Sequence, residues 1–208
     1  MLAAIVCPLG LLAGVQMRRT PLCHTMSESG VSRRIVVTGI STFTSLGHTP
    51  DDFFDNLLDG KCGIGPLTRF DPAEYKPVPR IASEVSGFNV HDYWSPHPDH
   101  DSRHGYFDPD LHDRYVHFSV AAANCCLKDA GLEIATLEHP NRFGCYVATG
   151  AGGIGTLEES CRRLFDGGEE AVSGPDPLGV SNTGTHVTAR EIGARGPCMN
   201  FVSACASG

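Results

Sequence analysis

The sequence lacks an excess of positive charge. It contains 16 Lys and Arg against 24 Asp and Glu, which gives a net charge of −8 with neutral histidines. Proteins that bind the nucleic-acid backbone cluster Lys and Arg so that counterions are displaced from the phosphates. The charge balance therefore argues against a nucleic-acid partner. It leaves small-molecule substrates, or a partner protein with a basic patch of its own.

The sequence also lacks an apolar run long enough to cross a membrane. A spanning helix needs about 20 consecutive apolar residues, whereas Pro8 and Gly10 interrupt the apolar stretch at the N-terminus. Hydrophobic residues make up 41% of the 208 positions and charged residues 19%, which is typical of a globular protein with a substantial core. We therefore expect no membrane span.

Paired cysteine motifs are absent as well, although the chain has 9 cysteines. No C-x-x-C occurs. Cys125 and Cys126 are adjacent in an alanine-rich helical stretch, and Cys145 lies in an apolar run typical of a strand. These surroundings favour buried free thiols in a reducing compartment over a disulfide framework.

Acidic residues are missing from the N-terminal segment before Glu28, and Arg18 and Arg19 follow its apolar stretch. A secretory signal carries its positive charge ahead of the apolar stretch, so this order argues against secretion. Two interpretations of the extension at residues 1–32 stay open. It is a transit peptide to a mitochondrion or plastid, or it is upstream sequence with Met26 as the true start of a cytoplasmic protein.

Strands and helices alternate along the rest of the chain, which predicts an α/β protein with a central, largely parallel sheet. One predicted helix has Thr49 as its N-cap, Pro50 in its first turn and Gly60 just past its end. Pro and Gly between 63 and 89 predict an ordered loop with short strands. The other predicted elements are buried strands at 33–40 and 141–149, a strand ending at Cys205, and helices at 113–131, 156–168 and 182–193. No linker or internal repeat divides residues 33–208, so we expect one domain.

Residues 91–117 hold six of the ten histidines, mixed with aspartates and prolines. A metal site needs ligands on a fixed scaffold, such as two histidines at i and i+4 on a helix. No such pair falls on a predicted helix, and Pro96, Pro98 and Pro109 break regular structure. We therefore expect a solvated surface insertion at about 91–112 and no metal site. A His-rich metal-binding protein is the alternative from another functional class.

A glycine cluster follows the predicted strand at 141–149: Gly150, Gly152, Gly153 and Gly155. A Walker loop would continue with Lys-Ser or Lys-Thr, and a dinucleotide-binding motif would have a different spacing and an acidic residue further on. Neither condition is met, so we expect no nucleotide cofactor. The glycines instead indicate that backbone approaches closely here, between helix and strand or beside a substrate channel.

Cys205 stands where the last predicted strand gives way to small residues, in the run S-A-C-A-S-G. A thiol at a helix N-terminus is activated by unpaired backbone N–H groups, and small neighbours permit a tight turn and close substrate approach. The same geometry aims the backbone N–H of Cys205 at an oxyanion. From the residues alone, a nucleophile and a small buried cysteine at a strand end both remain open.

The run GPCMNFVSACASG, residues 196–208, resembles the active-site signature of the β-ketoacyl-acyl-carrier-protein synthases, which are condensing enzymes of the thiolase fold. Gly196, Phe201 and the five residues from Ala204 meet the signature. The opening RRIVVTGISTFTSLGHTPDDFFDNLLDGK and the later runs KDAGLE, VATGAGGIGTLEE and GARGP are also similar to the family and occur in its order. The resemblance covers residues 33–208.

This resemblance implies the N-terminal half of a thiolase-like α/β fold, with an incomplete βαβαβαββ unit. It implies a decarboxylative Claisen condensation in fatty-acid biosynthesis, with Cys205 carrying the acyl chain as a thioester. The partners are an acyl-carrier protein with acyl and malonyl groups and, at full length, a second copy in a homodimer. No cofactor or metal is implied. Gly150, Ala151, Gly152 and Gly153 would shape the acyl pocket, and the small Ala151 implies a roomier pocket than in many long-chain members.

The family's two catalytic histidines lie well beyond the cysteine, and no histidine follows Cys205 here. His186 precedes the cysteine, and the remaining cluster belongs to the predicted insertion, so neither takes over that role. We therefore expect this chain alone to be an inactive, unstable fragment. A non-catalytic scaffold or chain-length partner of the same fold is the alternative function, although such partners usually lack the cysteine.

Overall fold

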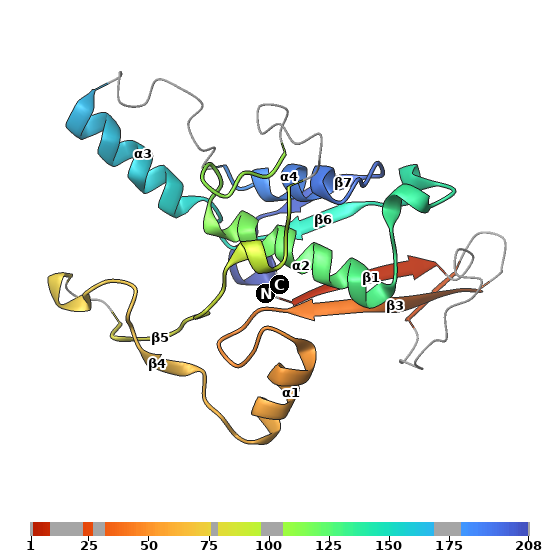
Figure 1. Cartoon of the computed structure of the whole chain (residues 1–208), viewed down its shortest axis with the longest axis horizontal. Coiled ribbons are helices and arrows are strands. Elements are labelled where there is room, and N and C mark those ends of the chain that lie inside the picture. Colours follow the sequence, from red (N-terminus) through yellow and green to blue (C-terminus); the bar gives the residue numbers. More distant parts are fainter. Residues whose placement is uncertain are drawn as a thin grey trace. The chain divides into compact units, whose positions relative to one another are not determined.

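The computed structural model describes residues 2–8, 23–26, 32–75, 79–96, 106–168 and 180–207 (Figure 1). The chain divides into two compact units, Met1–Phe88 with Cys125–Leu132 and Asn89–Asn124 with Glu133–Gly208. Helix α2 (Arg114–Ala130) therefore contributes to both units. We expected one domain over residues 33–208. The units alternate along the chain rather than following one another across a linker, and the domain limits stay a prediction.

The sheet of the first unit is antiparallel and has β3 (Ser32–Thr42) at its centre, between β1 (Leu2–Pro8) and β2 (Cys23–Met26). The pairing of β1 with β3 shifts register once, between Ile5 and Val6. Such a bulge inserts an unpaired residue and increases the local twist. Both strands that pair with β3 come from the predicted N-terminal extension. Part of that extension therefore belongs to the sheet of the first unit.

The strand expected at 33–40 is confirmed, but its predicted burial is wrong in part. Val37 and Ile40 are 43% and 41% exposed. An antiparallel sheet needs cover on one face only. The C-terminal end of α2 provides close cover at Gly39, where a side chain would collide with the backbone of Cys126.

Helix α1 (Pro50–Leu58) begins and ends where the sequence predicts. The Thr49 hydroxyl accepts a hydrogen bond from the backbone N–H of Asp52 at 3.1 Å, which caps the helix. Gly60 follows the end with a φ of +70°, a conformation that favours glycine. Three of its apolar side chains are largely exposed in this unit: Phe54, Leu57 and Leu58.

The segment between α1 and residue 89 is an ordered loop with short strands, as expected. Its strands β4 (Ile64–Pro66) and β5 (Ile81–Ser83) pair antiparallel. The backbone N–H groups of Thr68 and Arg69 donate to one carboxylate oxygen of Glu84, at 3.0 and 3.2 Å. This carboxylate therefore ties together the two sides of the loop.

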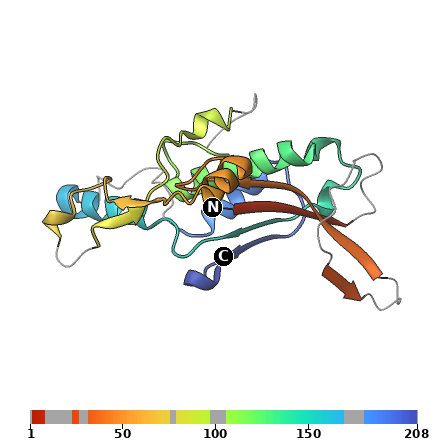
Figure 2. The ribbon, with the colours of Figure 1, turned by 90° about the horizontal axis from the view of Figure 1, so that it is seen from below.

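In the second unit, β6 (Cys145–Ala148) and β7 (Cys198–Phe201) pair in parallel, with α4 (Thr183–Glu191) packed against them. Cys145 and Val147 of β6 are buried with Ala189 of α4. Figure 2 shows β7 leading into a short helical turn at the C-terminal end of the chain. The two parallel carboxyl ends therefore meet on the same side of this unit, where ligand sites of parallel sheets usually lie.

Among the described strands only β6 and β7 are parallel, so the sheet is less parallel than we expected. Parallel strands need a long crossover, which α3 (Ile154–Gly167) and α4 provide between β6 and β7. The strands that flank β3 precede it closely in sequence and pair antiparallel.

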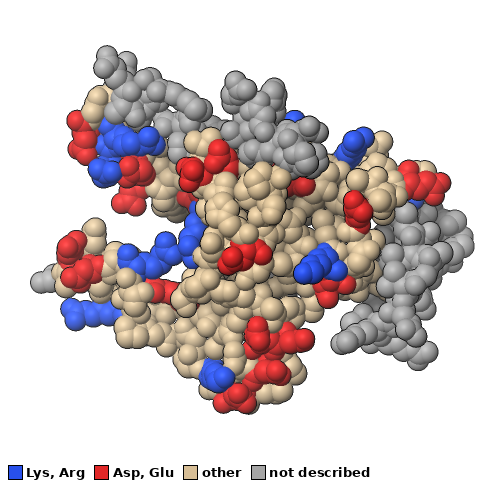
Figure 3. All heavy atoms as spheres, viewed as in Figure 1, with Lys and Arg blue, Asp and Glu red and all other residues tan. Residues whose placement is uncertain are grey.

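Helix α3 confirms the helix predicted at 156–168. Gly153, with a φ of 88°, precedes its first residue, and Gly168 follows its last with a φ of 70°. Within the helix Arg162 lies 2.7 Å from a carboxylate oxygen of Glu159 and 3.5 Å from one of Asp166. Figure 3 shows that basic and acidic atoms lie close together in the region of α3.

The surface insertion expected at 91–112 stays a prediction, and two aromatic residues in its described parts are buried while His91, Asp92, Ser95, Pro96 and Asp110 are exposed. Trp94 and Phe107 are 7% and 0% exposed, and their rings meet edge to face with centroids 4.9 Å apart. The Glu191 carboxylate accepts a hydrogen bond from Trp94 Nε1 and one from the Phe107 backbone N–H, each at 2.7 Å. Residues 97–105, with three of the predicted insertion's histidines, lie outside the described residues.

Two described histidines of this region pack against an aromatic side chain. The rings of His112 and His117 pack on Phe107, with centroids 5.7 and 5.2 Å away. Burial lowers the pKa of His117, and its Nε2 lies 2.9 Å from the carbonyl oxygen of His112. The described side chains contain no group of three or more His, Cys, Asp or Glu able to hold a metal ion. None of the described helices is both long and apolar enough to span a bilayer.

Candidate active site around Cys205

The predicted nucleophile lies just beyond β7, in a short 3₁₀ turn at Ala204–Ser207. The sequence predicts a strand that ends at Cys205, but the strand ends at Phe201, four residues earlier. The Cys205 residue is exposed. This exposure argues against the alternative of a small buried cysteine, because a structural thiol of that kind is shielded from solvent.

The turn that carries Cys205 is strained. Ala204 has a φ of 49°, and it is the one non-glycine residue with a positive φ in the described part of the chain. The left-handed conformation costs an L-residue about 1–2 kcal/mol. A sharp, strained turn between a strand and a helix is also how nucleophile elbows expose a reactive side chain. The backbone therefore sets the direction of Cys205.

Ser207 links this turn by hydrogen bonds to the residue that follows β6. Its hydroxyl accepts a hydrogen bond from the backbone N–H of Ser203 at 2.7 Å and donates one to the carbonyl oxygen of Thr149 at 3.0 Å. The backbone N–H of Thr149 in turn donates to the carbonyl oxygen of Phe201 at 3.0 Å. These bonds hold the residues after β6 beside the residues after β7.

The structure brings the first of the predicted pocket residues to this turn. A Cβ atom at Gly150 would lie 3.8 Å from the carbonyl oxygen of Ala204. Ala151 follows and is exposed, whereas Gly153 is buried at the start of α3. Gly150 thus lies next to the turn that carries the predicted nucleophile.

Thr149 and Tyr115 together explain why glycine is required at position 152, and the sequence did not reveal either contact. A Cβ atom at Gly152 would lie 2.8 Å from the Thr149 hydroxyl oxygen and 2.9 and 3.0 Å from two carbon atoms of the Tyr115 ring, which is too close for unperturbed contacts. Gly184 at the start of α4 meets the same ring. A close approach to the backbone of the glycine cluster is therefore found at Gly152, whereas a Cβ at Gly150 or Gly155 would make contacts of ordinary length.

Burial keeps four other described thiols of the chain in their neutral form. Burial, with a smaller contribution from neighbouring Cys198, raises the pKa of Cys145 to about 12. Burial also raises the pKa of Cys198, Cys125 and Cys126. A thiol reacts as the thiolate, so these four positions are poor nucleophiles at neutral pH.

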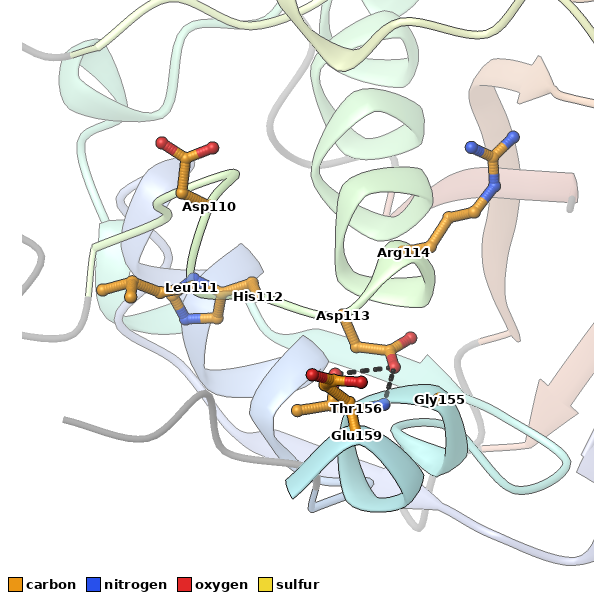
Figure 4. Close-up of a pocket in the computed structure, with 8 residues that line it drawn as sticks. All are labelled: Asp110, Leu111, His112, Asp113, Arg114, Gly155, Thr156 and Glu159. Atoms are coloured by element: carbon orange, nitrogen blue, oxygen red, sulfur yellow. Dashed lines mark hydrogen bonds between the residues drawn. The ribbon is translucent and has the colours of Figure 1, made fainter. Parts of the chain in front are cut away.

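An open cavity of about 290 Å³ lies at the N-terminal ends of α2 and α3 (Figure 4), and Cys205 is not among the residues that line it. It contains none of the predicted site residues. Figure 4 shows Asp113 between the two helices, with its carboxylate directed at the first turn of α3. The lining residues are Asp110, Leu111, His112, Asp113, Arg114, Gly155, Thr156 and Glu159.

Solved structures that are similar to this chain include ketosynthases. The ishigamide ketosynthase/chain length factor superposes with a TM-score of 0.63 at 23% identity, over 79% of this chain and 38% of that one. A type II PKS ketosynthase, bound to the hexaketide and in complex with its acyl-carrier protein, gives a TM-score of 0.62 at 19% identity, over 83% and 38%. The fold is therefore the N-terminal half of a thiolase-like ketosynthase, as predicted.

Sequence comparison narrows this class to a family. The model of the β-ketoacyl synthase N-terminal domain matches residues 32–208, and the chain belongs to the β-ketoacyl synthase family. It is 33% identical over 177 residues to 3-oxoacyl-[acyl-carrier-protein] synthase 2 of Synechocystis sp.. That match covers 85% of this chain and 39% of the relative, so the chain spans about two-fifths of the relative's length.

Proposed function

We propose that the complete protein containing this chain is a 3-oxoacyl-acyl-carrier-protein synthase of fatty-acid biosynthesis, with Cys205 as its nucleophile. The observation that carries the proposal is the placement of Cys205. It is an exposed thiol on a strained turn, beside the glycine cluster, within residues that match the β-ketoacyl synthase domain. The name of the Synechocystis relative supports the reaction.

In the first half of the reaction, the Cys205 thiolate attacks the thioester carbonyl of an acyl-carrier protein. A new thioester forms on Sγ, and the carrier's thiol leaves. Malonyl-carrier protein then loses carbon dioxide, and the resulting carbanion attacks the acyl group on Cys205. A carbon–carbon bond forms, the Cys205 thiolate is released, and the 3-oxoacyl product remains on the carrier.

Residues of this chain would take part in both steps of the reaction, the acyl transfer and the condensation. The backbone N–H of Cys205 would donate to the oxyanion that develops on the attacked carbonyl. Gly150, Ala151, Gly152 and Gly153 would line the acyl chain's path, and the small side chain of Ala151 would leave room there. An acyl-carrier protein and a second copy of the protein are the proposed partners. The ketosynthase solved with its carrier protein supports the first of them.

Acyl transfer to the complete protein tests the proposal. The protein is incubated with an acyl-carrier protein that bears a medium-length acyl chain and is then analysed by peptide mass spectrometry. We expect the acyl mass on the peptide with Cys205, and its loss in Cys205→Ser. Cys161→Ser is the matched control, because Cys161 is a second exposed thiol. An unmodified Cys205 would contradict the proposal and favour the non-catalytic partner of the same fold.

A further inference from the structure

The first turn of α2 holds α3 through one carboxylate. Asp113 accepts a hydrogen bond from the Tyr115 backbone N–H at 3.1 Å, and so caps its own helix. Its other oxygen accepts from the backbone N–H of Thr156 at 3.1 Å and from the Thr156 hydroxyl at 2.9 Å (Figure 4). A carboxylate at a helix N-terminus satisfies unpaired N–H groups and interacts favourably with the dipole. Asp113 does this for α2 and α3 together.

Tyr115, two residues later, packs against the glycine cluster and against the start of α4. Its ring occupies the space that a side chain at Gly152 or Gly184 would need. Its hydroxyl accepts a hydrogen bond from the Gly184 backbone N–H and donates one to the carbonyl oxygen of Val180, each at 2.9 Å. Burial is the main cause that raises the pKa of Tyr115, so the phenol keeps the proton that it donates.

The glycine cluster transmits this placement to the nucleophile. Gly150 lies against the carbonyl oxygen of Ala204, the residue before Cys205. Gly152 lies two residues further on, between the Thr149 hydroxyl and the Tyr115 ring, and α3 begins at Ile154. The segment Gly150–Gly153 is therefore held at one end by the Cys205 turn and at the other by the first turn of α2.

We propose that Asp113 and Tyr115 are positioning residues that set the course of Gly150–Gly153, and thereby the length of acyl chain that fits beside Cys205. The inference rests on the proposed function, because it assumes that an acyl chain passes this segment. Neither side chain touches the reacting atoms. Their effect is on the path of the chain, so they change discrimination between long and short acyl groups more than the reactivity of the thiol.

The test compares acylation of Cys205 in the complete protein across carrier proteins with short, medium and long acyl chains. The first variant is Gly152→Ala, whose new methyl group meets the Tyr115 ring. The matched control is Gly155→Ala, where a Cβ would meet only an Asp113 oxygen at an ordinary 3.6 Å. We expect Gly152→Ala to lower the rate of acylation by long chains about tenfold or more, which is the fold-change that corresponds to modest overpacking. The rate of acylation by short chains should fall less. Gly155→Ala leaves the ratio of long-chain to short-chain rates unchanged.

A second substitution shows whether the ring is responsible. Tyr115→Leu removes the collision with the ring, whereas the Thr149 hydroxyl oxygen stays 2.8 Å from the new methyl group. The double variant Gly152→Ala/Tyr115→Leu therefore recovers part of the long-chain rate, and the two changes are not additive. Iodoacetamide reacts with the Cys205 thiol without an acyl chain. If the variants alter only the path of the acyl chain, the rate of this reaction changes by less than about twofold. A double variant that recovers nothing would overturn the role of Tyr115.

Asp113→Asn and Tyr115→Phe test the same inference without overpacking, should the Gly152 variants not fold. The first weakens the bonds to Thr156, and the second removes the hydroxyl while keeping the ring. We expect a shifted ratio of long-chain to short-chain rates in both. If wild type is acylated but no variant changes this ratio, the inference is wrong and the proposed function stands. A wild type that is not acylated overturns both.

Discussion

Ser119 of α2 and Thr188 of α4 join their helices through a hydrogen bond of 2.7 Å between the two hydroxyls, and both residues are buried. A buried hydroxyl that loses its partner also loses the compensation for its desolvation. This pair therefore fixes α4 to α2 inside the second unit, next to the strands that carry the candidate site.

Ser119→Ala is expected to lower the free energy of unfolding by about 1–3 kcal/mol, since Thr188 is left unpaired. The double variant Ser119→Ala/Thr188→Val removes both hydroxyls and is expected to be nearly as stable as wild type. Denaturant titration of the purified protein measures both. A double variant that is less stable than Ser119→Ala would contradict this account of the pair.

Glu191→Gln is expected to loosen the buried ends of the His-rich segment. A carboxylate accepts from both Trp94 Nε1 and the Phe107 N–H, whereas an amide presents one oxygen and would leave a donor facing its NH₂ group. Trp94 is the single tryptophan of the chain and is 7% exposed, so its fluorescence reports this site directly. We expect a red-shifted emission and a stability loss of about 1–3 kcal/mol.

Glu138→Gln serves as the control for that variant, because the Glu138 side chain is 83% exposed. It should leave the emission unchanged. If Glu191→Gln also leaves it unchanged, the segment is held by the ring contacts of Trp94 and Phe107 rather than by the carboxylate.

Cys145 is expected to make stability depend on pH at the alkaline end. Burial raises the pKa of its thiol from 9.0 to about 12, so the folded state keeps the proton when the unfolded chain has released it. Its contribution to stability is complete below pH 9 and is lost as the pH rises toward 12, at up to about 1.4 kcal/mol per pH unit.

The comparison with Cys145→Ala isolates that contribution from other groups that titrate at high pH. We expect the variant's unfolding free energy to fall less steeply than that of wild type above pH 9, in denaturant titrations followed by Trp94 fluorescence. Equal slopes would show that the Cys145 thiol ionises alike in both states.

Removal of residues 1–25 is expected to expose β3, because it takes away all of β1 and most of β2. Backbone N–H groups that lose their strand partners exchange faster with solvent. Hydrogen exchange of Ser32–Thr42 in the complete protein and in the protein that starts at Met26 measures this. Unchanged exchange would mean that the segment is dispensable for the fold.

The transit-peptide interpretation of residues 1–32 stays a prediction. Fusion of these residues to a fluorescent protein tests it in cells that contain mitochondria and plastids. Import into either organelle would support it, and diffuse cytoplasmic fluorescence would favour Met26 as the start.

Local patterns predicted the local features of the fold well. Thr49 caps α1, and Gly60, Gly131 and Gly193 follow helix ends with positive φ, because capping and left-handed turns depend on neighbouring residues alone. The order of β6, glycine cluster and α3 was likewise visible in the sequence. The end of β7 was placed four residues too late, since Val202 and Ser203 continue its apolar and β-compatible character.

Contacts between distant residues were not predicted. Tyr115 and Gly184 lie 69 positions apart, and nothing in the run D-R-Y-V marks the tyrosine as a partner of glycines elsewhere. The burial of Trp94 and Phe107 was missed for the same reason, because Trp94 donates to Glu191, 97 positions away. Of the candidate site, Cys205 and the glycine cluster came from the motif and its family resemblance, whereas the residues that support them required the structure.

The left-handed backbone at Ala204 affects how the Cys205 residue is oriented. Its φ of 49° fixes the direction of the following residue through torsion angles rather than through contacts made by the cysteine side chain. Under the proposed function, a thiol held in this way would need no adjustment when one acyl group is exchanged for another. Part of the entropy cost of bringing sulfur and carbonyl together would then be met during folding.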